Sequence, residues 1–235
     1  MNNLLFYSGF KDVGLTVFST TRKIGSMKTA GKIKNQNLKK AMLLKNLDFN
    51  NLVLAEQVHS SNIAEVFNVK ENLIKGCDGI VTCKKGLVMG IITADCLPLV
   101  FYDSKNKILA VAHAGCKGIL EGIAQNLILK LKKMGADIKN LKMLVGPSIC
   151  GECYEVSEKL IKEFKKKFPR ISAINSNSFL DLRKIVFEVA VKNGLIPENI
   201  EISNLCTKEN TSFLFSARAS RNKTFGEFGT FALIS

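Results

Sequence analysis

Short apolar runs separated by polar breaks predict most of the strands of this chain. Runs of four to eight apolar or β-branched residues bounded by turn residues are typical of strands. We assign strands to 13–20, 51–56, 62–67, 79–82, 86–93 and 142–146, with shorter ones near 200–206, 212–217 and 228–234. The neighbouring runs 79–82 and 86–93 are expected to pair with each other.

Apolar residues at the helical period predict helices at 37–47, 119–134, 155–168 and 181–194, and the polar stretch 23–36 is expected to be a loop. Gly135 closes the second helix, and Pro169 ends the third. Strands outnumber helices, and no repeat or linker divides the chain. The pattern therefore predicts one α/β domain over residues 1–235, a sandwich around a mixed β-sheet.

Two further apolar runs, 97–102 and 107–112, flank the turn residues DSKN and predict a β-hairpin. If the loop is 104–105 or 103–106, opposed residue numbers sum to 209, and Cys96 faces His113. Directly opposed side chains have β-carbons about 4.5–5.5 Å apart, close enough to share a proton or a metal ion. A loop of three or five residues would shift the register by one and separate the pair.

The chain has two histidines, and the second one, His59, lies between two expected strands. Together His59, Cys96 and His113 form a plausible incomplete tetrahedral set for zinc, with one position open. Thiolate and imidazole ligands also suit copper. The alternatives are that Cys96 is a small buried apolar residue and that the histidines are an ordinary core residue and a surface residue.

Two glycine-containing turns add weaker signals. Gly115 and Gly118 flank Lys117 at an expected helix start, which indicates either an anion site or a simple tight turn. Cys150 and Cys153 form a CxxC pair, which suggests half a zinc site or a redox pair. No second CxxC motif exists in the sequence, so neither interpretation is favoured.

The net charge of +14 comes mainly from scattered lysines, and the densest run, KEFKKK at 162–167, has helical spacing. It is expected to form one solvated helix face. Aromatic residues are not interleaved with the basic clusters, which argues against a nucleic-acid partner.

The expected cellular location follows from signals that the sequence lacks. No uncharged apolar stretch reaches 18 residues, so no membrane span is expected. The N-terminal apolar run is too short for a signal peptide, and the seven cysteines form no dense framework. We therefore expect a cytoplasmic protein with free thiols, and the sequence gives no indication of its oligomeric state.

A series of motifs resembles the YfiH-like family, which has been labelled laccase-domain or polyphenol oxidase and more recently purine nucleoside phosphorylase. In chain order these motifs are QVH (57–59), CDGIVT (77–82), ADCLPLVFYD (94–103), AVAHAG (110–115), GPSICGECYEV (146–156), DL (181–182), LCT (205–207) and FSARAS (215–220). The family usually has Trp-Arg after HAG, whereas this chain has Cys116-Lys117, which keeps the charge but loses the planar guanidinium.

The resemblance implies an α/β/α sandwich and a metal, zinc or alternatively copper, held by His59, Cys96 and His113. It also implies phosphorolysis of adenosine, inosine, guanosine and methylthioadenosine, with adenosine deamination as a further activity. The expected partners are therefore purine nucleosides and phosphate.

Under this reading Cys96 and His113 belong to the catalytic centre, and phosphate docks near Lys117. Asp78 and Asp95 are candidate general acids or partners that orient the histidines. The remaining candidate substrate contacts are Arg22 and Arg218.

Two other enzyme activities remain as alternatives. One is a metal-free hydrolase or deamidase in which His113 activates a Cys96 thiolate. The other is a single-copper polyphenol oxidase, since two histidines are too few for several coppers. A non-enzymatic basic binding module ranks last.

Overall fold

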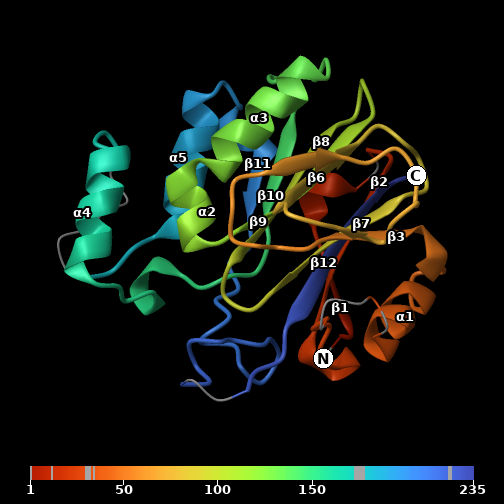
Figure 1. The fold of residues 1–235 in the computed structure, drawn as a ribbon, viewed down its shortest axis with the longest axis horizontal. Helices are drawn as coiled ribbons and strands as arrows, with labels where there is room; N and C mark the ends of the chain where they lie inside the picture. The colour runs from red at the N-terminus through yellow and green to blue at the C-terminus, as the bar shows by residue number, and fades with distance from the viewer. Residues whose placement is uncertain (1, 12, 30–32, 34, 172–177, 222–223) are drawn as a thin grey trace.

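The computed structural model describes residues 2–11, 13–29, 33, 35–171, 178–221 and 224–235. Its strands form two six-stranded mixed sheets (Figure 1). The first sheet has the order β1 (Leu4–Phe6), β2 (Leu15–Thr20), β12 (Phe228–Ile234), β7 (Val88–Thr93), β3 (Leu52–Ala55), β5 (Leu73–Ile74). The second has the order β11 (Ile200–Ile202), β10 (Lys142–Val145), β8 (Leu97–Asp103), β9 (Ile108–Ala114), β6 (Gly79–Thr82), β4 (Ile63–Glu65).

Helices cover the outer faces of both sheets. They are α1 (Gln36–Leu43), α2 (Cys116–Glu121), α3 (Ile123–Lys133), α4 (Glu158–Lys167) and α5 (Leu182–Lys192). Short 3₁₀ turns lie at η1 (Ser8–Phe10), η2 (Arg22–Ile24), η3 (Phe49–Asn51), η4 (Gly151–Cys153) and η5 (Pro197–Asn199). The side chains of Asn35, Ser157 and Asp181 accept backbone N–H groups at the starts of α1, α4 and α5 and so fix where these helices begin.

Three apolar clusters hold the helices and the two sheets together in layers. Leu38 and Met42 of α1 pack on the first sheet, and residues of α2 to α5 pack on the second. Between the sheets, Val53 and Ile91 of the first meet Val100 and Val111 of the second. The expected mixed α/β fold with helices on both outer faces is confirmed, and the sheet layer between the helices is double.

Three expectations about single elements are wrong. The expected helix 119–134 is divided by Gly122, whose φ of 96° ends α2 before α3 begins. The runs 79–82 and 86–93 are strands, but β6 and β7 lie in different sheets and do not pair. Residues 212–217 form turns rather than a strand.

The hairpin exists, but its register differs from the expected one. Pro98 pairs with His113 and Asp103 with Ile108, so opposed numbers sum to 211 and the loop is 104–107. The Asp103 carboxylate accepts the N–H groups of Lys105 and Asn106, and Lys107 turns left-handed with a φ of 54°. The direct opposition of Cys96 and His113 is therefore wrong. The observed register is shifted by two residues from the expected one. Because side chains alternate with a period of two, this shift leaves each side chain on the same face of the sheet as expected.

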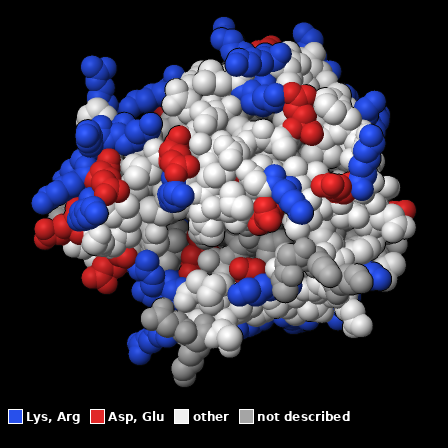
Figure 2. Space-filling view, in the orientation of Figure 1, with Lys and Arg blue, Asp and Glu red and all other residues white. Residues whose placement is uncertain are grey.

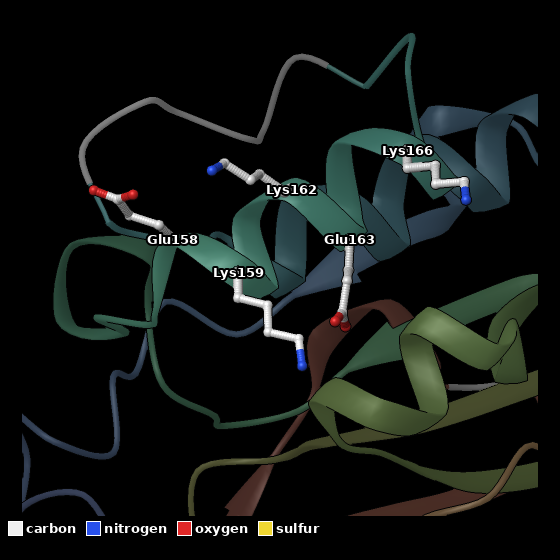
Figure 3. A pocket seen from close by; sticks show the side chains of 5 residues that line it. All are labelled: Glu158, Lys159, Lys162, Glu163 and Lys166. Atoms are coloured by element: carbon white, nitrogen blue, oxygen red, sulfur yellow. The ribbon is translucent and has the colours of Figure 1, made fainter.

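The lysines of α4 are exposed, as the helical spacing predicted. Figure 3 shows Lys159, Lys162 and Lys166 on this helix beside Glu158 and Glu163, which line a shallow hollow together with the lysines. Basic side chains are scattered over the rest of the visible face as well (Figure 2).

In the part of the chain that the structure describes, no helix has the length and hydropathy needed to cross a bilayer. Residues 30–32 and 34 of the expected loop 23–36 lie outside the described residues.

Candidate active site

Three distant segments bring His59, Cys96 and His113 together. His59 follows β3, Cys96 lies in the turn where the chain passes from β7 in the first sheet to β8 in the second, and His113 is near the end of β9. One donor atom from each residue lies within 4.8 Å of the other two. The two imidazole rings are 4.7 Å apart and nearly perpendicular. We call these three residues the open cluster.

Asp78, directly before β6, holds the open cluster in place. Its Oδ1 accepts the backbone N–H of His59 at 3.0 Å and lies 2.7 Å from His113 Nδ1, while its Oδ2 accepts the N–H and the hydroxyl of Ser60 at 2.7 and 2.8 Å. The Asp78 side chain is fully buried. Burial raises the pKa of Asp78, but these hydrogen bonds outweigh burial and hold the pKa below its usual value.

The side chains of the open cluster shift one another's protonation. Burial raises the pKa of Cys96, but hydrogen bonds with His113 and His59 outweigh it and bring the pKa down to about 7. Burial lowers the pKa of His113, but Asp78 and Cys96 raise it to about 9. Without a metal, His113 is therefore mainly imidazolium at neutral pH, and Cys96 is divided between thiol and thiolate.

Backbone strain is concentrated at this site. Gln57, His59 and Asp95 all have positive φ, of 65°, 59° and 88°. The Gln57 side chain supports this conformation by pairing with both the N–H and the C=O of Ile92, at 2.8 and 2.6 Å. Such conformations are costly for residues other than glycine and cluster at functional sites.

The donors fit a metal ion such as zinc or copper. Because Nδ1 of His113 contacts Asp78, its Nε2 is left for a metal, which is the usual arrangement of a ligating histidine. Gly115 keeps the centre of the cluster free: a β-carbon there would lie 3.2 Å from Cys96 Sγ and 3.3 Å from atoms of both imidazoles. Two imidazoles and a thiolate are ligands for either zinc or copper.

A cavity of about 350 Å³ opens beside the cluster and includes all three of its residues in its wall. Thr93 also lines it and is 2 % exposed, and its hydroxyl has no hydrogen-bond partner in the described structure. Burial raises the pKa of Glu227 on the same wall, with Lys28 opposing. Phe225, whose ring is 4.7 Å from Lys28 Nζ, adds an aromatic surface.

Asp95 makes its contacts away from the histidines. Its Oδ1 accepts the hydroxyl of Thr207 at 2.5 Å, and its Oδ2 accepts the backbone N–H of Arg218 at 2.6 Å. The carboxylate therefore anchors the turn that carries Cys96.

The three basic candidates lie outside the cavity wall. The Arg22 guanidinium stacks on Phe215 and donates to the carbonyl of Thr211, and the Arg218 guanidinium lies over Tyr154. Lys117 is exposed and 3.7 Å from Glu121. Among the described residues of the wall, Lys28 is the one lysine, and there is no arginine.

Sequence reasoning missed Thr93, Glu227 and Lys28. Thr93 stands directly before the ADC motif, which was a usable signal. Glu227 and Lys28 carry no local motif. They reach the cavity because β12 lies beside β7 and because Met27, in the segment after η2, donates its N–H to the carbonyl of Glu227.

Comparison with known proteins agrees with this architecture. Residues 26–235 match the family model described as multi-copper polyphenol oxidoreductase laccase. The chain is 34 % identical over 187 residues to adenosine deaminase RL5 from an unknown prokaryotic organism, covering 73 % of this chain and 71 % of that protein. It is 29 % identical over 194 residues to purine nucleoside phosphorylase YlmD of Bacillus subtilis (strain 168), covering 76 % and 69 %.

Solved structures show the same fold. The crystal structure of Bacillus licheniformis hypothetical protein YfiH superposes with a TM-score of 0.82 at 26 % identity, over 94 % of this chain and 93 % of that one. For YlmD from Geobacillus stearothermophilus the TM-score is 0.88 at 22 % identity, over 99 % and 96 %. The chain therefore belongs to the multi-copper polyphenol oxidoreductase laccase family, the YfiH-like family that its motifs resemble.

Proposed function

We propose that this protein is a zinc-dependent purine nucleoside phosphorylase with adenosine deaminase activity. Adenosine, inosine, guanosine and methylthioadenosine are its proposed substrates. The observation that carries the proposal is the open cluster set in the wall of a cavity of ligand size. The names of two relatives, adenosine deaminase RL5 and purine nucleoside phosphorylase YlmD, support the choice of reaction.

In this proposal His59, Cys96 and His113 hold the zinc ion, which when bound supplies Lewis-acid polarisation of a substrate oxygen. Asp78 keeps the His113 ring oriented with Nε2 toward the ion. Asp95 fixes the turn of Cys96 through Thr207 and Arg218. The protein's two histidines cannot hold several coppers, so a multi-copper oxidase does not fit this site.

The cavity residues take the other roles. In phosphorolysis a phosphate oxygen bonds to C1′ of the ribose, the glycosidic bond breaks, and the departing purine takes up a proton. Glu227 is the proposed source of that proton, because burial raises its pKa and favours its acid form. Lys28 is the cation on the wall for phosphate, and the Thr93 hydroxyl is free to bind the nucleoside. Arg22, Lys117 and Arg218 remain proposed contacts at the outer end of the substrate.

The test is to incubate the purified protein with adenosine, with and without phosphate, and to identify the products. Adenine that forms only with phosphate indicates phosphorolysis, and inosine in both tubes indicates deamination. If none of the four nucleosides is converted by metal-loaded protein, the proposed function is wrong.

A metal-free Cys–His enzyme is the second candidate. Cys96 would be the nucleophile and His113 the base beside it, and Asp78 would orient the His113 ring. Metal analysis of untagged protein separates the two candidates. Loss of one zinc per chain together with activity in His59→Asn supports the first. Full activity in His59→Asn with an unchanged zinc content, abolished by Cys96→Ala, supports the second.

A further inference from the structure

A second group of metal-ligating side chains lies outside the cavity. Cys150 and Cys153 come from the segment after β10, and Cys206 and Glu209 from the segment after β11. One donor atom from each lies within 4.8 Å of the other three. We call these four residues the closed cluster.

The contacts inside the closed cluster already bring the donors toward a common centre. The backbone N–H of Cys150 donates to Cys206 Sγ at 3.4 Å, and the Cys153 thiol donates to Glu209 Oε1 at 3.7 Å. Cys153 and Cys206 are buried, so these donors are shielded from solvent.

Arg183 of α5 holds the two segments together. Its buried guanidinium donates to the hydroxyl and carbonyl of Ser148 on one side and to the carbonyls of Ser203 and Leu205 on the other. The two halves of the closed cluster are thus fixed in position by groups that are not themselves donors.

We propose that Cys150, Cys153, Cys206 and Glu209 form a second, structural metal site that takes a zinc-type divalent ion. Four donors without an open position are the pattern of a structural zinc site. At a zinc–sulfur distance of about 2.3 Å, tetrahedral ligands lie about 3.8 Å apart, so the donors need to close by only about 1 Å or less. A disulfide would use two of the three thiols and leave the third and Glu209 without a role.

This ion would stabilise the turn that carries Cys96. Ile149, next to Cys150, donates its N–H to the carbonyl of Asp95 at 3.0 Å, and Thr207, next to Cys206, donates to the Asp95 carboxylate at 2.5 Å. Both segments of the closed cluster therefore contact Asp95, the neighbour of Cys96. The second site supports the active-site turn without reaching the cavity.

The first test measures zinc in a variant that lacks the ligands of the open cluster. Its outcome therefore does not depend on the proposed function. The double variant His59→Asn/Cys96→Ser, purified without tag or chelator under reducing conditions, is expected to retain about one zinc per chain. Adding Cys150→Ser and Cys153→Ser should remove that zinc. Adding Cys83→Ser, an exposed cysteine outside both clusters, should leave it.

A milder substitution is needed in case the variants at Cys150 and Cys153 do not fold. Glu209 is exposed, so Glu209→Gln needs no repacking, and it should weaken zinc retention against a chelator by about tenfold or more. No zinc in the double variant, zinc unaffected by Cys150→Ser/Cys153→Ser, unchanged retention in Glu209→Gln, or a Cys150–Cys153 disulfide in freshly isolated protein would each overturn the proposal.

Discussion

The two clusters use the same kinds of ligand in opposite settings. The open cluster has three donors, strained backbone at His59 and a cavity on one side, whereas the closed cluster has four donors and lies outside that cavity. A metal with three protein ligands keeps a position for substrate, and a metal with four does not. Under the two proposals, the open cluster performs chemistry and the closed cluster stabilises the chain around it.

The largest expected effect comes from removing one donor of the open cluster. His59→Asn keeps a residue that tolerates the φ of 59° but lacks imidazole. Nucleoside turnover should fall by more than about a hundredfold, since even losing an outer partner of a metal ligand costs 10–100-fold. The zinc of the closed cluster should stay bound. Activity at the wild-type level would remove the distinction between the clusters.

Removing donors of the closed cluster should mainly lower stability and have little effect on turnover. Cys150→Ser/Cys153→Ser is expected to lower the free energy of unfolding by about 3–4 kcal/mol, if free zinc exceeds the dissociation constant by a hundred- to a thousandfold. The melting temperature should then fall by roughly 6–16 °C, while turnover per folded molecule changes by less than about tenfold. Calorimetry beside a Cys83→Ser control measures this. A loss of turnover as large as in His59→Asn, with stability kept, would contradict the assignment.

Asp78→Asn should weaken zinc binding at the open cluster by about 10–100-fold and leave the closed cluster unaffected. All the groups around the carboxylate are donors or a ring nitrogen: the N–H of His59, the N–H and hydroxyl of Ser60, and Nδ1 of His113. An amide NH₂ in this pocket must therefore face a donor or force the His113 proton onto Nε2. Chelator competition reports the affinity, and equal affinity in wild type and variant would show that Asp78 does not orient the ligand.

Thr93→Val tests whether the cavity binds substrate. The hydroxyl has no partner in the described structure, so its removal should leave stability unchanged or slightly higher. If the hydroxyl binds the nucleoside, the loss of one hydrogen bond raises KM by about 2–12-fold. Steady-state kinetics and a melting curve on the same sample decide the question. A drop in stability with unchanged KM would make Thr93 a packing residue.

The smallest effect is a pH dependence from Glu227. Its folded-state pKa is raised above 4.5, so the unfolded chain loses this proton at lower pH than the folded protein. Its contribution to stability is present below about pH 4.5 and is lost as the pH rises through the folded pKa. Glu227→Gln should therefore melt at a higher temperature than wild type at neutral pH and at an equal temperature at low pH. It should also lose turnover.

Local patterns predicted individual elements well, and the strands 79–82 and 228–234 have the predicted bounds. The three open-cluster residues come from distant segments, and their convergence was expected from the resemblance to the YfiH-like family. The pairing of 79–82 with 86–93 failed because both runs are buried throughout, and such strands carry no alternation that identifies their sheet. The hairpin register failed because the Asp103 side chain extends the turn to Lys107.

Contacts between distant segments were beyond local reasoning. The Cys150-x-x-Cys153 pair was visible, but its partners Cys206 and Glu209 lie more than 50 residues away and form no second CxxC motif. Glu227 reaches the cavity through the position of β12 beside β7. In both cases the pairing of strands, rather than any spacing in the sequence, brings the side chains together.

The most direct test of the open cluster is an anomalous-scattering map from crystals of untagged protein, recorded at the zinc edge. The account predicts a peak about 2.0–2.3 Å from Cys96 Sγ and from one nitrogen of each histidine, facing the cavity. A second peak among the cysteines of the closed cluster is also expected. An active crystal form with no peak between His59, Cys96 and His113 would contradict it.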